Sequence, residues 1–166
     1  MMKHFVSRRG FQAALAAAAM IALTPSVSHA QSAPFAGLSG VWSGSGSIAL
    51  ANGSKERIKC RATYAVGDNG NGLQQTLRCA SDSYRFELSS NVKNNNGKIF
   101  GTWSEATRNV SGDLEGRASH GLFEVVVSSP AFTANLNLST RGNSQTVRIT
   151  SQGTEFSGVT ITLARS

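Results

Sequence analysis

Apolar side chains recur at every second position along most of the chain after residue 37. A period of two is typical of β-strands with one buried face, whereas an amphipathic helix repeats every ~3.6 residues. One face of the stretch from 58 to 66 carries Ile58, Cys60, Ala62, Tyr64 and Val66. We find no convincing helical period, so the chain is predicted to be all-β.

Turn residues fix how these strands pair. Asn69-Gly70 is typical of a two-residue type I′ turn, because both central residues of that turn need positive φ. A turn centred there places Cys60 directly opposite Cys79. Further turns are expected at 94–97, 129–130 and 142–143. At Asn52-Gly53 a two-residue turn would put apolar Leu50 beside Lys55, so we predict a three-residue loop or a bulge there.

The predicted fold is an antiparallel up-and-down β-barrel of about 8–10 strands, a meander covering residues 38–166. A chain of 166 residues with 40% apolar and 15% charged side chains is typical of one compact domain. Closure would bury the apolar face and remove exposed strand edges. Two alternatives remain: a two-sheet sandwich, and an outer-membrane barrel, whose lipid side would have to hold a basic or glycine-spaced face.

The first 30 residues have the pattern of a cleavable export signal. Lys3, Arg8 and Arg9 precede an Ala-rich apolar run, and Ala30 stands at the expected cleavage position. The run is too short to span a bilayer, and the mature chain has no candidate transmembrane segment. Residues 31–37 are predicted to be a short linker. The mature protein, of charge about +4, is expected to be periplasmic or secreted.

Two short motifs resemble known families. Ser7-Arg8-Arg9-Gly10-Phe11 is similar to the twin-arginine export motif. Gly40-Val41-Trp42 resembles the Gly-x-Trp element of calycins, the lipocalins, avidins and related small barrels. The resemblance implies that an arginine on the last strand, here Arg165, covers Trp42 and closes one end of the barrel. The opening sequence also resembles nitrobindin-like barrels, which hold haem through a histidine. No histidine of this chain matches that ligand, so no cofactor is expected.

The two cysteines are predicted to form a disulfide. Cys60 and Cys79 are the only cysteines, they fall opposite each other, and the chain is predicted to be exported. Two buried thiols are the alternative. A metal site is not expected, because two thiolates need two further ligands and no histidine lies nearby in the sequence.

The inward face includes polar and aromatic residues that could line a ligand pocket. A closed core normally excludes unpaired polar groups, so several together indicate a lumen that is not simply filled. The candidate ligand-binding set is Trp42, Tyr64, Gln75, Tyr84, Trp103 and Glu105. A buried Glu105 would need a raised pKa or hydrogen-bond partners, unless it lies at a strand end in water. Inward glycines such as Gly44 and Gly112 either leave room for a ligand or permit tight curvature.

These residues predict a non-enzymatic protein that binds a small hydrophobic or aromatic, amphipathic molecule in the barrel lumen. We find no nucleophile elbow, metal-binding histidine pair or phosphate loop. His120 falls between two strands, where an exposed turn residue is the simpler reading.

The alternative is an interaction or structural module that contacts an anionic envelope component. It would use a basic outer stripe of Arg57, Lys59, Arg61 and Arg78, with Arg61 opposite Arg78. Solvated surface charge is the simpler explanation for the stripe. Nucleic acid is not an expected partner, because aromatic residues do not cluster on that face.

Overall fold

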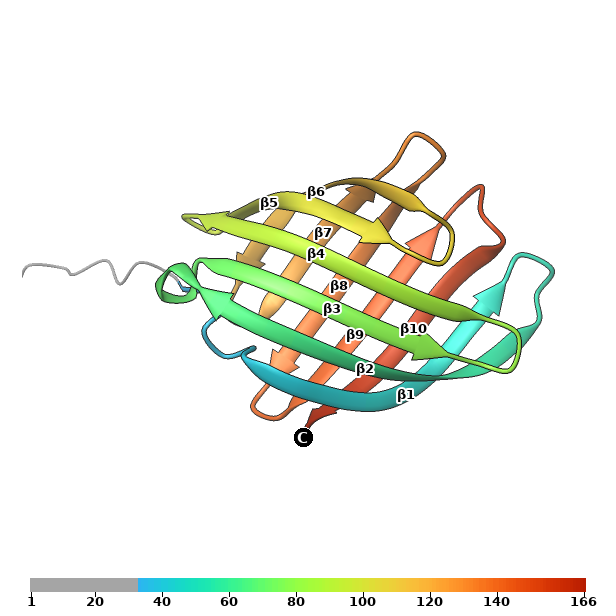
Figure 1. Ribbon diagram of the computed structural model, residues 1–166, viewed down its shortest axis with the longest axis horizontal. Helices are drawn as coiled ribbons and strands as arrows, with labels where there is room; N and C mark the ends of the chain where they lie inside the picture. Colours follow the sequence, from blue (N-terminus) through green and yellow to red (C-terminus); the bar gives the residue numbers. More distant parts are fainter. Residues whose placement is uncertain (1–32) are drawn as a thin grey trace, which may run out of the picture. The chain divides into compact units, whose positions relative to one another are not determined.

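The structure is a computed structural model that describes residues 33–166 as a closed antiparallel barrel of ten strands (Figure 1). Each strand pairs with the next, and β10 returns to pair with β1. The strands are β1 (Gly40–Leu50), β2 (Lys55–Gly67), β3 (Gly72–Ala80), β4 (Arg85–Asn95), β5 (Lys98–Glu105), β6 (Val110–Ser119), β7 (Leu122–Ser128), β8 (Thr133–Arg141), β9 (Ser144–Ser151) and β10 (Phe156–Arg165). This architecture confirms the predicted meander barrel. The predicted export signal lies outside the described residues.

The turn chemistry sets the register as predicted. Asn69 and Gly70, within the short 3-10 turn η1 (Asp68–Gly70), have φ of 53° and 88°, and Cys60 pairs with Cys79. Between β1 and β2 the ladder ends at Ala49 and Lys55, and Leu50 N–H donates to the Ser54 carbonyl across a three-residue loop. The predicted loop length is therefore confirmed, and it keeps the apolar face of β1 inward.

Cys60 and Cys79 form the predicted disulfide between β2 and β3. Both side chains are buried, at 5% and 6% exposure, on the inner face of the barrel. Disulfides persist in oxidising compartments and are rare in the cytoplasm, so this bond is consistent with an extracytoplasmic protein.

Arg165 closes one end of the barrel, as the calycin resemblance implies. Its guanidinium lies 4.5 Å from the centre of the Trp42 ring, and Trp42 and Arg165 are partners in the β1–β10 ladder. The guanidinium also donates to the backbone carbonyls of Gly37 and Ser39. Trp42 itself is fully buried and donates from Nε1 to the Leu38 carbonyl at 2.8 Å. The contact between Trp42 and Arg165 therefore belongs both to the β1–β10 pairing that closes the sheet and to the covering of this end of the barrel.

The residues before β1 belong to the core. Phe35, in the segment predicted to be a linker, is only 1% exposed and stacks on Phe123 with ring centres 5.9 Å apart. Its backbone N–H donates to the Gly70 carbonyl, which ties the segment to the β2–β3 turn. Burial of one large ring therefore seats residues 33–38 across the same end of the barrel that Arg165 closes.

The inward glycines permit curvature. A Cβ added at Gly112 would collide with the backbone carbonyl oxygen of Ser128, and one at Gly44 would collide with that of Thr162. Since the obstructing atoms are backbone, no rotation of a side chain can relieve the clash. Of the two readings that the sequence left open, close approach of neighbouring strands is the one observed at these positions.

We predict that Gly112→Ala lowers the free energy of unfolding by about 1–3 kcal/mol, the usual cost of overpacking. The matched control is Gly67→Ala, since Gly67 is extended, with φ of −127°, and an added Cβ there meets nothing within 4 Å. That variant should be neutral or slightly stabilising. Urea unfolding of both proteins measures the difference, and equal stabilities would contradict the curvature argument.

Candidate functional site

The barrel encloses a cavity of about 420 Å³ that is lined mainly by apolar side chains. This volume lies within the ~300–1,000 Å³ typical of small-molecule pockets. The wall facing β2–β5 is built largely from aliphatic side chains of β7, β8 and β9, with Phe123 of β7 as its aromatic member. The aliphatic side chains include Val125, Val127, Ala134, Leu136, Leu138, Val147 and Ile149. The sequence therefore gives the lumen an apolar wall that a small apolar molecule could contact.

A row of polar and aromatic side chains crosses the opposite wall. Tyr64, Gln75, Ser90 and Trp103 are successive ladder partners on β2, β3, β4 and β5. All four line the cavity. Parity alone placed them on the inner face, and the register now brings them into one line across four strands.

The polar atoms of this row are largely paired within the protein. The Tyr64 hydroxyl donates to Gln145 Oε1 at 2.7 Å, and Ser90 Oγ donates to Gln75 Oε1 at 3.0 Å. Trp103 Nε1 donates to the Asp113 and Ser128 carbonyls. Burial raises the pKa of Tyr64, and the bond to Gln145 offsets only part of that rise. The phenol therefore stays protonated at neutral pH, and the row contributes shape more than free hydrogen-bonding capacity.

Glu105 ends β5 as a buried carboxylate, at 6% exposure, that is held by the following loop. Its oxygens accept hydrogen bonds from the backbone N–H groups of Glu87, Thr107 and Arg108 and from the Thr107 hydroxyl, at 2.7–3.1 Å. Desolvation alone would raise the pKa of Glu105, but these hydrogen bonds outweigh it and the net pKa is lowered. Of the two possibilities that the sequence allowed for a buried Glu105, a raised pKa or hydrogen-bond partners, the structure therefore shows hydrogen-bond partners.

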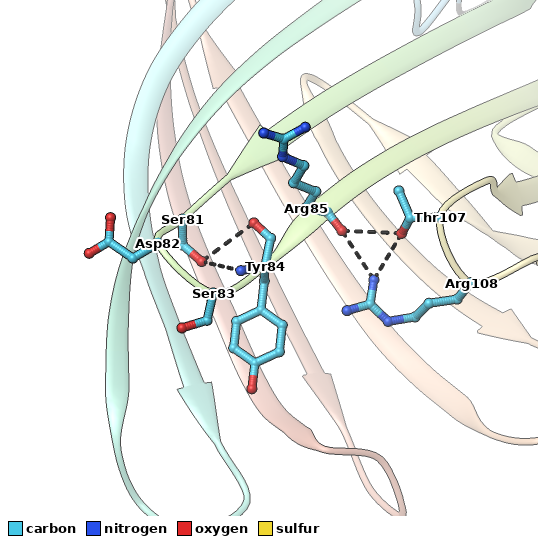
Figure 2. A pocket seen from close by; sticks show the side chains of 7 residues that line it. All are labelled: Ser81, Asp82, Ser83, Tyr84, Arg85, Thr107 and Arg108. Carbon is cyan, nitrogen blue, oxygen red and sulfur yellow. Dashed lines mark hydrogen bonds between the residues drawn. The ribbon is translucent and has the colours of Figure 1, made fainter.

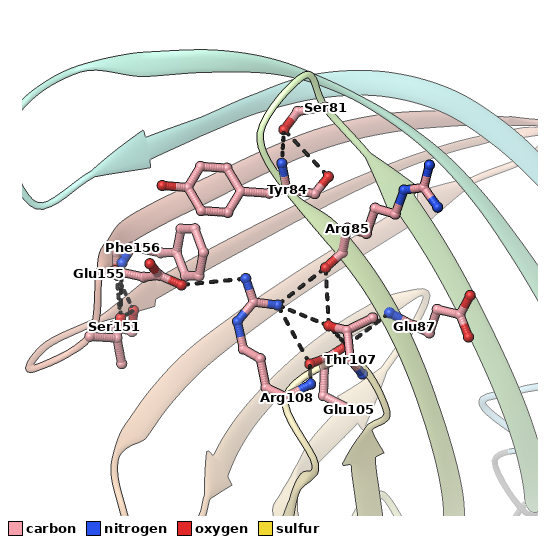
Figure 3. A network of polar contacts seen from close by, with 11 residues as sticks. Ser81, Tyr84, Arg85, Glu87, Glu105, Thr107, Arg108, Ser151, Glu155 and Phe156 are labelled. Carbon is pink, nitrogen blue, oxygen red and sulfur yellow. Dashed lines mark hydrogen bonds and ion pairs between the residues drawn. The ribbon is translucent and has the colours of Figure 1, made fainter.

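One end of the barrel forms a mouth around the loops 81–84, 106–109 and 152–155, and Arg108 lies across it (Figure 3). Its guanidinium lies 4.6 Å from the Phe86 ring centre and 5.2 Å from that of Phe156. Nη1 donates to the Arg85 carbonyl at 3.2 Å and lies 3.5 Å from Glu105 Oε2, while Nη2 contacts Glu155 Oε1 at 3.3 Å. Arg108 thus links its own loop to the start of β4 and to the β9–β10 loop at the opening of the lumen.

Beside Arg108 a shallow polar pocket of about 460 Å³ opens on the outer side of the mouth (Figure 2). Ser81 Oγ accepts from Tyr84 N–H at 3.0 Å, which shapes the β3–β4 loop. The Tyr84 ring packs against Phe156, with ring centres 5.0 Å apart. Together with Phe86, these rings form the aromatic rim of the mouth.

The structure brings four members of the candidate ligand-binding set to the cavity: Tyr64, Gln75, Trp103 and Glu105. The other two lie elsewhere. Trp42 is sealed beneath Arg165 at the closed end, because that arginine and Leu38 occupy its free sides. Tyr84 lines the pocket at the mouth instead of the lumen.

Two residues of the site were missed by the sequence analysis. Gln145 is fully buried and joins Tyr64 to Thr140, where its Nε2 donates to Oγ1 at 3.1 Å. It shares the parity of Val147, so alternation could have found it. Arg108 comes from a loop, where alternation carries no information about side-chain direction.

His120 lies exposed in the β6–β7 turn, with φ of 48°, and outside the lining of the cavity. Within residues 33–166, no group of three or more His, Cys, Asp or Glu side chains is placed to hold a metal ion. The same part of the chain contains no helix long and apolar enough to cross a bilayer.

The basic stripe of Arg57, Lys59, Arg61 and Arg78 is exposed on the outer wall. Arg61 and Arg78 are ladder partners, as predicted, while Glu87 is the next partner of Arg78. In the described residues, none of the four basic side chains forms an ion pair, since both ion pairs found there involve Arg108.

Comparison with known proteins identifies the architecture. No protein-family model matches the chain, and a search of curated proteins gives no match. Among solved structures, Rv2717c from M. tuberculosis superposes with a TM-score of 0.61 at 12% identity, covering 79% of this chain and 94% of its own. The S-type phycobiliprotein lyase CPES from Guillardia theta gives 0.55 at 12% identity, with 80% and 90% covered. These neighbours and the closed ten-stranded barrel fit a calycin-like fold.

We predict that Glu105→Gln destabilises the protein at pH 7 by about 1–3 kcal/mol, because an amide N–H2 would face backbone N–H donors. A carboxylate whose pKa is lowered on folding stabilises the native state above its unfolded pKa of about 4.3. That contribution is lost as the pH falls through the lower folded pKa. Chemical unfolding at pH 7 and pH 3 should therefore show that the difference in free energy of unfolding between wild type and variant is smaller at pH 3. A difference in free energy of unfolding that does not change with pH would contradict the role given to the Glu105 carboxylate.

Proposed function

We propose that this barrel is an exported, non-enzymatic protein that binds a small apolar or aromatic molecule in its lumen. The observation that carries the proposal is the cavity of about 420 Å³ with its mainly apolar lining. Apolar side chains that face a cavity lack contacts on that side, and an apolar occupant would supply them. The likeness to a phycobiliprotein lyase, at 12% identity, supports the barrel fold on which the proposal depends.

A binding role is favoured over catalysis by how the polar groups are used. Glu105 already accepts four hydrogen bonds, and Tyr64 is held protonated against Gln145. Neither group is poised to exchange a proton with a molecule in the lumen. Export is supported by the disulfide and by the signal-like pattern of residues 1–30.

We predict that the protein binds the neutral apolar dye Nile red and that Val125→Phe weakens this binding about tenfold or more by filling the lumen. Val125 lines the cavity, whereas its neighbour Val126 faces outward and is 39% exposed. Val126→Phe is therefore the matched control and should bind the dye as wild type does. Dye fluorescence measures both affinities. If Nile red does not bind, or if the two variants weaken its binding equally, the proposal is wrong.

A second candidate is contact with an anionic envelope component through the basic outer stripe. It is favoured by the direct opposition of Arg61 and Arg78, since like charges in a cross-strand pair repel each other unless an anion lies nearby. Glu87, the other ladder partner of Arg78, supplies part of that neutralisation. The stripe is therefore a weaker basis for function than the cavity.

For this candidate, we expect Lys59→Glu with Arg61→Glu to abolish binding to vesicles of anionic lipid at low salt, where electrostatic contacts are least screened. Arg141→Glu with Arg148→Glu changes the net charge equally on β8 and β9 and is the control. Cosedimentation measures binding. If both double variants bind alike, the stripe has no specific role.

A further inference from the structure

The mouth of the lumen holds a single cation in a set of apolar and acidic neighbours. Arg108 is the only Lys, Arg or His among the described residues that line the cavity. Glu105 and Glu155 line the same opening. The polar end of any ligand that extends from the lumen to this mouth must therefore interact with the charges of Arg108, Glu105 and Glu155.

One side of the Arg108 guanidinium is fixed to the barrel wall. Nη1 donates to the Arg85 carbonyl at 3.2 Å and to Thr107 Oγ1 at 3.1 Å. The plane of the group rests against Phe86 and Phe156. Backbone and ring partners cannot move without distorting β4 or β10, so this side is preorganised.

The other side is held by one exchangeable partner. Nη2 contacts Glu155 Oε1 at 3.3 Å, and the Glu155 side chain is 55% exposed in the β9–β10 loop. In the described part of the chain, Nε of Arg108 takes part in no hydrogen bond that competes for this edge. The edge formed by Nε and Nη2 suits a carboxylate, which can accept two parallel hydrogen bonds from it.

Glu105 does not compete for that edge. Its two oxygens are occupied by hydrogen bonds from Glu87, Thr107 and Arg108 backbone N–H groups, so its charge is met locally. It lies on the Nη1 side of the guanidinium, at 3.5 Å. Displacing Glu155 would leave Arg108 as a cation with an open, oriented edge.

We propose that the ligand is an amphipathic anion whose apolar body fills the lumen and whose carboxylate replaces Glu155 on Arg108. This inference rests on the proposed lumen binding and names the class of its ligand. A cationic head would be repelled by the Arg108 guanidinium, and both carboxylates at the mouth, Glu105 and Glu155, are already in contact with that arginine. An anionic head has to displace only one exposed side chain, and it gains a second hydrogen bond in doing so.

The test compares three amphiphiles that share one alkyl chain. Decanoate, 1-decanol and decyltrimethylammonium are used to displace Nile red at about pH 8, where the carboxylate is ionised. Decanoate should bind about tenfold more tightly than decanol, because a hydrogen-bonded ion pair to a preorganised arginine adds to the shared apolar contact. Decyltrimethylammonium should bind no more tightly than decanol.

Variants locate the preference. Glu155→Gln should raise the ratio of decanoate to decanol affinity about threefold, since it removes an exposed competitor. The control Glu115→Gln removes the same charge from the outer face of β6 and should leave the ratio as in wild type. Arg108→Gln should lower the ratio to about one, with the melting temperature and Nile red affinity checked first.

Failure of the two proposals is distinguishable. If Nile red and decanol do not bind, the lumen itself is not a binding site. If they bind but decanoate shows no preference, or Glu155→Gln moves the ratio no more than Glu115→Gln does, the anion assignment is overturned. Should Arg108→Gln not fold, Glu155→Gln decides alone, since its side chain is exposed and the change is isosteric.

Discussion

Pairing of the first strand with the last is the constraint on which the rest of the molecule depends. If β1 and β10 did not pair, each would leave a row of unpaired N–H and C=O groups at a sheet edge, and the apolar face of the sheet would not be enclosed. Trp42 and Arg165 are partners in that final ladder, and their stacking also covers the closed end. A cation over an indole ring contributes about 0.5–2 kcal/mol, more where water is excluded, so the seam gains a stabilising contact where closure has to be secured.

Curvature and cavity follow from the same choice of small residues. At Gly44 and Gly112 the neighbouring strand lies too close for a Cβ, so these glycines let the sheet bend. Across the barrel, most inward side chains of β7 to β9 are valine, leucine, isoleucine or alanine, and Gln145 is the one that contacts Tyr64 on β2. A closed sheet of ten strands is wider than such residues can fill, because barrel diameter grows with strand number. The lumen thus results from strand count together with short inner side chains.

Much of this fold could be predicted because alternation and turn chemistry are local signals. The Asn69-Gly70 turn fixed the register that places Cys60 opposite Cys79, and parity placed Tyr64 and Gln75 inside. The volume of the cavity could not be predicted, since it depends on strand number and tilt, which no single hairpin encodes. Phe35 was missed for another reason: its segment has no periodicity, and only tertiary packing buries it. The same limit hid Arg108, whose direction is set by the hydrogen bonds of its loop to Glu105.

The two ends of the barrel use the same pairing of arginine with aromatic rings for different purposes. Arg165 covers one ring and donates to the backbone carbonyls of Gly37 and Ser39, partners that belong to the folded chain and cannot be exchanged. Arg108 covers two rings but completes its contacts with an exposed carboxylate, Glu155, whose ion pair at the surface is worth only ~0–1 kcal/mol. An incoming carboxylate could replace that partner at little cost, whereas nothing could replace the carbonyls at Arg165. The arginine at one end of the barrel is therefore held only by partners within the folded chain, whereas the arginine at the other end completes its contacts with an exposed, exchangeable carboxylate.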